Sequence, residues 1–438
     1  MRKMESLNQA IEDARSRYAS LNPKSQAADK SAEKFFPGGN TRTVLHFDPF
    51  PLTMVGGEGA EITDLDGHRY VDFVGEFSAG LFGHSNEVIK SAVQKAMNDG
   101  FVMGAPTNYE RELAGLLCER FPSIDKLRFC NSGTEANLMA LTTSRIVTGR
   151  EKVLVFNDAY HGGVIKFLGG PSAFNVPFDF VLADFNDTEG TSEIIDKVAD
   201  DLAAVIIEPV LGAGGNILAD KSFLEMLRQK TQEIGAVLIF DEVKTARLGK
   251  TGVQGMMGVQ PDMTTLGKFI AGGLPTGAFG GSAEIMDRFN PKLKGALAHP
   301  GTFNNNVCSM AAGCAAMGQI YTSQRAAAFF DWSETFRTSL NNLFVAKDVP
   351  MYANGLGSMI AIHFSSEETK TPSDISTGCR ALRPLLHMEM LHEGVSICGR
   401  GDFFLSLPMN ESHLSNARDA LEKFIDRHRH LIQQVLDD

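Results

Sequence analysis

The sequence lacks the features of several protein classes. Only six of its 438 residues are cysteine, and no two of them form a Cys-x-x-Cys pair. This scarcity argues against a disulfide framework and a structural zinc site, so the thiols are expected to be reduced core residues. Acidic residues (53) outnumber basic ones (41), for a formal net charge of −12, so a nucleic-acid partner is not expected.

Long apolar runs are also missing. The N-terminal stretch, MRKMESLNQAIEDARSRYAS, mixes both charge signs at helical spacing and has no apolar core of the kind a signal peptide carries. No run approaches the roughly 18 apolar residues that a membrane span needs. Low-complexity tracts and short repeats are absent, which argues against a solenoid or a propeller. We therefore expect a soluble, cytoplasmic protein without a membrane partner.

What is present is typical of a folded chain with a large core: 43 % of the side chains are apolar. Residues 1–75 are predicted to hold an exposed amphipathic helix at Met4–Tyr18 and then a meander of short strands. In residues 76–325, helical stretches alternate with short apolar runs, a pattern typical of a parallel sheet covered on both faces. These runs are Leu127–Cys130, Lys152–Phe156, Ala203–Ile207, Ala236–Phe240 and Met263–Gly267.

Residues 326–438 change to long helices with a few strands, Met359–His363 and Phe403–Leu407 among them. We interpret them as a smaller α+β domain, which the N-terminal segment joins in space. The predicted fold class is thus α/β, with a large domain built on a mostly parallel, doubly covered sheet and a smaller α+β domain formed by the N- and C-terminal segments.

Polar residues follow each predicted strand of the large domain. Because ligands bind beyond the carboxyl ends of the strands in an open parallel sheet, we expect these residues to meet in one crevice. They are Asn131–Asn137, Tyr160–Gly163, Glu208–Pro209, Asp241–Val243 and Lys268.

Three of these features predict a specific chemistry. Ser132, Gly133 and Thr134 stand between a strand and a helix, where hydroxyls and free backbone N–H groups bind a phosphate; simple helix capping is the alternative. Asp241 ends a buried strand and needs a cationic or donating partner such as a protonated ring nitrogen, unless it caps a helix. Lys268 has apolar, glycine-rich flanks that free a nucleophilic amine, the alternative being a lysine that reaches solvent. Together they specify pyridoxal 5′-phosphate held as a Schiff base.

At this point a family resemblance is evident. Over nearly its whole length the sequence resembles class III aminotransferases of PLP fold type I, in the branch similar to glutamate-1-semialdehyde aminomutase. Within that branch the surrounding residues follow the pattern of β-amino acid aminotransferases, such as those that act on β-phenylalanine. The motifs that carry the resemblance are Asn131–Asn137, Tyr160–Gly162, Glu208–Pro209, Phe240–Val243, Thr265–Lys268, Gly272–Gly281 and Gly301–Phe303, with Asn40–Leu45 and Glu76–Gly80 for the β-amino acid pattern.

The resemblance implies roles for single residues. Lys268 would bind the cofactor covalently and move the substrate proton, while Asp241 would pair with the ring nitrogen. It also implies a homodimer with shared active sites, in which Thr302 reaches the phosphate from the partner subunit. The remaining implied cofactor contacts are Ser132, Gly133 and Thr134 at the phosphate, Tyr160 and Val243 on opposite ring faces, and His161 and Glu208 nearby.

Two arginines are predicted to recognise substrate carboxylates, because a guanidinium binds a carboxylate bidentately. By resemblance, Arg42 would take the donor carboxylate and Arg400, between two glycines, that of the keto acid; surface ion pairs are the alternative. Lys244, where an apolar residue is more usual in the family, is predicted either to alter substrate preference or to point to solvent.

The leading hypothesis is a transaminase that moves an amino group from a β-amino acid, with an aromatic or aliphatic substituent, to 2-oxoglutarate or pyruvate. An intramolecular glutamate-1-semialdehyde 2,1-aminomutase is the main alternative. A PLP-binding protein without catalysis is a third.

Overall fold

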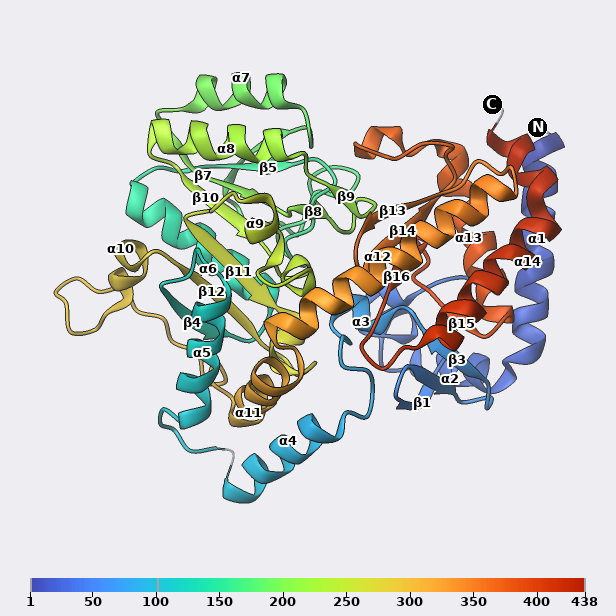
Figure 1. Cartoon of the computed structure of the whole chain (residues 1–438), viewed down its shortest axis with the longest axis horizontal. Coiled ribbons are helices and arrows are strands. Elements are labelled where there is room, and N and C mark those ends of the chain that lie inside the picture. Colours follow the sequence, from blue (N-terminus) through green and yellow to red (C-terminus); the bar gives the residue numbers. More distant parts are fainter. Residues whose placement is uncertain (1, 101, 437–438) are drawn as a thin grey trace.

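The computed structural model describes residues 2–100 and 102–436. Its largest sheet has seven strands in the order β4-β12-β11-β10-β7-β5-β6 (Figure 1). All neighbours pair in parallel except β12, which runs antiparallel to both β4 and β11. The bounds are β4 Lys126–Cys130, β5 Lys152–Phe156, β6 Asp179–Ala183, β7 Leu202–Ile207, β10 Val237–Asp241, β11 Met263–Gly267 and β12 Gly277–Gly281.

The five predicted strands are confirmed to within one or two residues, and β6 and β12 are additional. Sequence reasoning missed β12 because three of its five residues are glycine, so it does not stand out as an apolar run. Glycine is required there: a Cβ on Gly277 would lie 2.1 Å from the carbonyl oxygen of Ser132. Because Gly277 has no Cβ, β12 can lie against Ser132, which caps the helix α6 (Gly133–Thr148).

Both faces of this sheet are buried, as predicted. Leu154, Val205 and Leu238 pack with helices α7 (Thr188–Val198) and α8 (Lys221–Ile234) in one apolar cluster. Their immediate neighbours along the strands point the other way and pack on α6 (Gly133–Thr148) in a second cluster. The period of two along each strand produces this division. Other helices of this region are α4 Glu87–Asp99, α5 Asn108–Arg120, α9 Gly252–Met257, α10 Ala283–Met286 and α11 Val307–Gly313.

Smaller sheets bring distant parts of the chain together. β3 (Arg69–Asp72) pairs in parallel with β15 (Val395–Ser396), in a four-stranded sheet of order β1-β2-β3-β15. The division into residues 1–75, 76–325 and 326–438 stays a prediction. The other strands are β1 Met54–Glu58, β2 Glu61–Asp64, β8 Val210–Leu211, β9 Ile217–Leu218, β13 Tyr352–Leu356, β14 Met359–His363 and β16 Asp402–Phe404.

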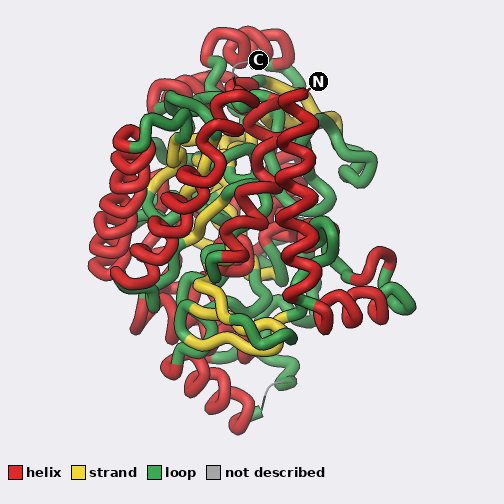
Figure 2. The backbone as a smooth tube through the Cα atoms, turned by 90° about the vertical axis from the view of Figure 1, so that its right-hand side faces the viewer, coloured by secondary structure: helices red, strands yellow, loops and turns green. Residues whose placement is uncertain are grey.

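The first helix differs from the expectation of an exposed helix. Leu7, Ile11, Ala14 and Tyr18 of α1 (Arg2–Leu21) are buried, because this apolar face packs on α13 (Thr377–His392) and α14 (Glu411–Leu436) of the same chain. Figures 1 and 2 show α1 beside α14, with both ends of the chain close together. The helix and its amphipathic pattern were predicted correctly, but the helices that cover its apolar face belong to the same chain.

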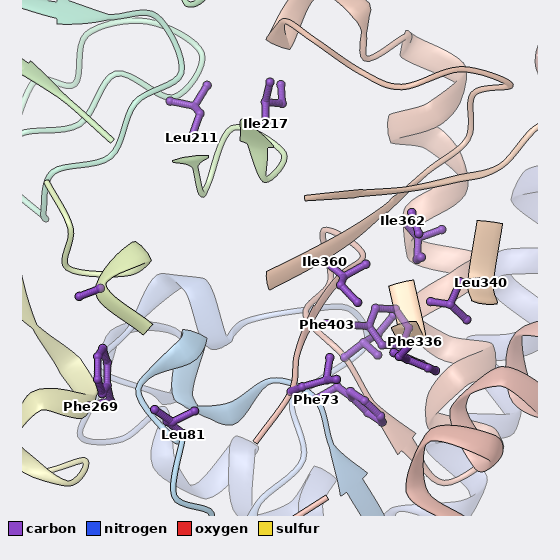
Figure 3. Packing of buried hydrophobic residues seen from close by; sticks show 14 of the residues in the cluster. Phe73, Leu81, Leu211, Ile217, Phe269, Phe336, Leu340, Ile360, Ile362 and Phe403 are labelled. Atoms are coloured by element: carbon purple, nitrogen blue, oxygen red, sulfur yellow. The ribbon is translucent and has the colours of Figure 1, made fainter. Parts of the chain in front are cut away.

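A continuous core joins the terminal segments to the rest. The ring of Phe73, which follows β3, lies 5.3 Å from that of Phe403 and 6.4 Å from that of Phe336, measured between centroids (Figure 3). Phe336 belongs to α12 (Ser323–Ala346). Further helical segments are α2 Pro23–Ala32, the turn α3 Gly75–Ser78, a π-helix at Cys314–Ile320, and 3₁₀ turns at Pro37–Gly39, Thr43–Leu45, Thr245–Arg247, Lys268–Ala271, Asp287–Phe289 and Pro372–Asp374.

The six cysteines are all free thiols. Across residues 2–100 and 102–436, no helix has the length and apolar character needed to cross a membrane.

Candidate active site

Asp241 is the last residue of β10 and is 4 % exposed. Its Oδ2 accepts hydrogen bonds from Asn137 Nδ2 (2.7 Å) and His161 Nδ1 (2.8 Å), and its Oδ1 accepts one from the N–H of Val243 (3.0 Å). These donors satisfy the buried carboxylate. A carboxylate offers about four acceptor positions, so Asp241 retains the capacity to accept from a ligand N–H.

The residues behind Asp241 form a hydrogen-bonded chain. Asn137, on α6, also donates to the carbonyl of His161 (2.9 Å) and accepts from the Thr265 hydroxyl (2.5 Å). His161 is buried, and its Nε2 has no hydrogen-bond partner among the described residues. Sequence reasoning gave Asn137 and Thr265 no role, although both lie in the motifs quoted above. The signal that could have found them is Asn137's position, one turn into the helix that starts the predicted phosphate site.

Lys268 follows β11 and has a left-handed backbone (φ 56°). Its Nζ donates to the carbonyl oxygen of Phe77 (3.0 Å) inside the molecule, so it is not a lysine reaching for solvent. Burial, and next the positive charge of Lys244, lower the pKa of Lys268 to about 8. An amine with such a pKa is available as a nucleophile at far lower pH than an exposed lysine.

The segment at the start of α6 has the geometry of an anion site. Ser132 is the N-cap of the helix, and its hydroxyl accepts from the N–H of Glu135 (3.1 Å), so the capping interpretation is correct. Capping leaves the N–H groups of Gly133 and Thr134 without intrahelical acceptors, at the positive end of the helix dipole. The same segment can therefore cap the helix and bind a phosphate.

Two glycines let the surrounding loops close around this segment. A Cβ on Gly133 would lie 2.7 Å from Val243 Cγ1, and one on Gly162 would lie 2.3 Å from the Thr134 hydroxyl. Val243 and the loop of His161 thus touch the start of α6 directly, while both also contact Asp241.

Tyr160 and Glu208 are tied together at the ends of neighbouring strands. Glu208 accepts from the N–H of Tyr160 (2.9 Å) through Oε2 and from the N–H of Gly212 (3.2 Å) through Oε1. Burial raises the pKa of Glu208. The side chain of Tyr160 is partly exposed, and the charges of Arg42 and Arg400 both act on it. Its stacking on a cofactor ring stays a prediction.

An unusual turn connects Arg42 to Lys268. Gly75, Glu76, Phe77 and Ser78 all have positive φ, a left-handed conformation that is costly for the three residues with a Cβ. The turn places the Phe77 carbonyl at Lys268 and forms an ion pair between Glu76 and Arg42, whose guanidinium lies 5.4 Å from the Phe77 ring centroid.

Neighbouring groups hold this turn in place. The Asp72 carboxylate accepts from the N–H groups of Val74 (2.9 Å) and Gly75 (3.0 Å). The buried Arg247 donates to the carbonyl of Ser78 (3.1 Å).

Arg400 is paired with a buried carboxylate. It donates to Asp402 Oδ2 (2.8 Å), and Asp402 is 1 % exposed. The negative charge of Asp402 raises the pKa of Arg400. Both arginines are therefore in ion pairs here, as the alternative interpretation expected, but Arg400 also lines a cavity of about 1230 Å³ together with Glu76 and Phe77. That cavity reaches Phe77, whose carbonyl oxygen accepts from Lys268.

Thr302 is not joined to the other predicted residues by any contact among the described residues. It is exposed, in a loop whose Asn304 accepts from the side chain of Asn131 (3.0 Å), next to the start of α6. Its contact with a phosphate across an interface stays a prediction.

The donor set fits pyridoxal phosphate. An amine with a lowered pKa, a carboxylate that can accept from a ring N–H and a helix start open to a phosphate lie around one space, and His161 Nε2 is still unpartnered. Fold and site together define an enzyme that uses pyridoxal 5′-phosphate at the carboxyl edge of a mostly parallel sheet.

Comparison with known proteins narrows this class. The class III aminotransferase family model matches residues 46–425. Beta-phenylalanine transaminase of Variovorax paradoxus is 43 % identical over 98 % of this chain and 99 % of its own. The crystal structure of a beta-phenylalanine aminotransferase from that organism has a TM-score of 0.95 and covers 97 % of this chain and 99 % of its own. Glutamate-1-semialdehyde 2,1-aminomutase 2 of Shouchella clausii is 38 % identical over 85 % of this chain and 90 % of its own.

A solved transaminase with PLP bound is 32 % identical, with a TM-score of 0.86 over 94 % of this chain and 99 % of its own. The chain belongs to the class III aminotransferases, and its cofactor is pyridoxal 5′-phosphate.

Proposed function

We propose that this enzyme transfers an amino group from a β-amino acid to a 2-oxo acid, such as 2-oxoglutarate or pyruvate, in two successive half-reactions. The observation that carries the proposal is the 43 % identity to beta-phenylalanine transaminase over nearly the full length of both chains. The two arginines, whose charges both act on Tyr160, support it, since each reactant brings at least one carboxylate.

When bound, pyridoxal phosphate supplies an aldehyde that takes up the amino group and a ring that accepts the electron pair released at the substrate carbon. Asp241 would hold a proton at the ring nitrogen, and His161 and Asn137 keep its carboxylate in position. Lys268 would bind the cofactor through Nζ, and the same Nζ would carry the proton between the substrate carbon and the cofactor. The Phe77 carbonyl orients that Nζ.

The remaining predicted residues position the cofactor. Ser132, Gly133 and Thr134 hold the phosphate at the start of α6. Val243, which packs on Gly133, and Tyr160 enclose the ring from its two faces. Glu208 fixes the backbone of Tyr160.

We further propose a cytoplasmic homodimer in which Thr302 of the partner subunit completes the phosphate site. Large apolar side chains support this: Phe35, Val102 and Phe303 are 80, 81 and 63 % exposed, and Phe303 adjoins Thr302. Exposed apolar groups of this size are typical of an interface. Sedimentation of the holoenzyme tests the dimer, and a fully active monomer would contradict it.

The two arginines divide the carboxylates between them. A β-amino acid places its carboxylate one carbon away from the amino-bearing carbon, which we assign to Arg42. A 2-oxo acid places a carboxylate directly beside the reacting carbon, which we assign to Arg400. The glycines on both sides of Arg400 let its backbone rearrange when an uncharged substituent enters instead.

A second candidate is an intramolecular aminomutase, which the 38 % identity to a glutamate-1-semialdehyde 2,1-aminomutase favours. Against it, Lys244–Leu248 lacks the aromatic residue that aminomutases usually carry after Asp-Glu-Val.

One panel separates the candidates. Purified holoenzyme is given β-phenylalanine, β-alanine, glutamate 1-semialdehyde or a simple chiral amine, each with and without 2-oxoglutarate. We expect turnover of a β-amino acid that depends on the oxo acid. Turnover of glutamate 1-semialdehyde alone, without an acceptor, would establish the aminomutase, and no spectral change with any donor would indicate a binding protein without catalysis.

A further inference from the structure

Lys244 is a cation that the proposed reaction uses only through its effect on the pKa of Lys268. It lies three residues beyond the end of β10 and is partly buried. Its ammonium lies 4.8 Å from the Phe404 ring centroid, and a Cβ on Gly212 would lie 2.5 Å from its Nζ. Among the described residues, no oxygen accepts a hydrogen bond from this Nζ. The ammonium is not one of the buried unpartnered atoms of the described residues, so it reaches solvent, where an entering anion can pair with it.

The carboxylates near Lys244 are already engaged. Asp402, whose charge acts on Lys244 most strongly, accepts from Arg400 (2.8 Å) and, at 3.4 Å, from the Asn216 side chain. Glu208, also close enough to act on Lys244, accepts from two backbone N–H groups. Among the described residues, the ammonium makes no hydrogen bond to either carboxylate and stays available to an anion that enters.

Lys244 also affects the balance of charges around Arg400. Arg400 and Lys244 bring two positive charges, and Asp402 and Glu208 bring at most two negative ones. An apolar residue in place of Lys244 would leave one positive charge fewer. A carboxylate entering beside Arg400 is thus stabilised by Lys244 as well, whereas an uncharged group gains nothing from it.

We propose that Lys244 makes the pocket beside Arg400 selective for a carboxylate, so that the preferred amino donor is a β-amino acid whose substituent is itself acidic. The inference rests on the proposed function and names its substrate class: 3-aminoglutarate carries one carboxylate for Arg42 and a second for Arg400 and Lys244. A donor with an aromatic substituent fills the same pocket without using the extra charge.

The test uses two unreactive probes of the same shape, glutarate and its monoamide glutaramate, which differ by one charge. Their dissociation constants for the holoenzyme are measured by titration calorimetry. We expect glutarate to bind at least tenfold more tightly than glutaramate. In Lys244→Met this ratio falls at least tenfold while glutaramate binding changes less than threefold, and Lys244→Arg keeps most of the preference. Lys221→Met, at an exposed lysine of α8, is the control and leaves the ratio unchanged.

Two results would overturn the inference: equal binding of the two probes by the wild type, or an unchanged ratio in a folded Lys244→Met. If Lys244→Met fails to fold, Lys244→Gln takes its place with the same expectation. Initial rates with 3-aminoglutarate, its monoamide and β-phenylalanine, each with 2-oxoglutarate, separate this failure from that of the proposed function. If β-phenylalanine is turned over but 3-aminoglutarate is not preferred to its monoamide, only the inference fails. If no β-amino acid is turned over, the proposed function fails.

Discussion

Replacing Lys268 with methionine is expected to stabilise the cofactor-free protein at neutral pH. The pKa of Lys268 is lowered from 10.5 to about 8 in the folded chain, so folding disfavours its protonated form. The penalty is present in full below pH 8 and disappears as the pH rises past the value of the unfolded chain, because between the two the unfolded state binds more protons. At about 1.4 kcal/mol per pKa unit, the penalty at pH 7 is roughly 3 kcal/mol.

Methionine also removes the hydrogen bond to the Phe77 carbonyl, which costs about 1.5–3 kcal/mol at every pH below the titration of the amine. The pH dependence therefore reports the whole pKa shift of Lys268, to which burial contributes most and the charge of Lys244 next. We expect the difference in unfolding free energy between Lys268→Met and wild type to shrink by about 2 kcal/mol between pH 7 and pH 9.5.

Urea unfolding of the cofactor-free proteins at both pH values measures this difference, with Lys221→Met as the exposed control that shows no such change. Competitive labelling with acetic anhydride, read by mass spectrometry, gives the pKa of Lys268 directly. In Lys244→Met the labelling midpoint should move upward, because a like charge has been removed. A midpoint above pH 10 in the wild type, or a stability difference that does not depend on pH, would refute the reasoning.

Four further substitutions test other parts of the site. Asp241→Asn should leave the fold intact but lower turnover by several orders of magnitude, because the negative charge that keeps the ring nitrogen protonated is lost. A wild-type kcat would contradict this. Gly277→Ala should destabilise the protein by about 1–3 kcal/mol in thermal or urea unfolding, because its Cβ would meet the Ser132 carbonyl at 2.1 Å. Arg400→Ala should cost about 2–4 kcal/mol of transition-state stabilisation in the half-reaction with the oxo acid, and Arg42→Ala should impair that with the amino donor. Single-turnover kinetics decides, and equal losses in both half-reactions would show the assignment to be wrong.

Whether a feature of this structure can be predicted from the sequence depends on how far apart in the chain the interacting residues lie. The strand that ends at Asp241 and the strand just before Lys268 are continuous apolar runs, a local signal, and were predicted within one or two residues. Strand β12 was missed because it is rich in glycine, and Gly277 is required by a close approach to Ser132, which lies 145 residues away in the chain. No local pattern reports such an approach.

The same limit applies to the site. The positions of Lys268 and Asp241 follow from where their strands end, but the support of Asp241 by Asn137 and His161 joins three separate segments. The left-handed turn at Glu76–Phe77 is held by nearby Asp72 and by a hydrogen bond from Arg247, 169 residues away from Ser78 in the chain, because residues with a Cβ do not favour it by themselves. The unpartnered ammonium of Lys244 likewise appears only once its neighbours are in place.

The docking of α1 on α13 has a consequence for synthesis on the ribosome. His392 bonds the carbonyl of Ala14, a contact that spans 378 residues of chain. At translation rates of about 5–20 residues per second, the apolar face of α1 waits roughly 20–75 s for its partner to be made. The first helix of the chain is therefore among the last to reach its final place, and β3, whose neighbour β15 is also made late, shares that wait.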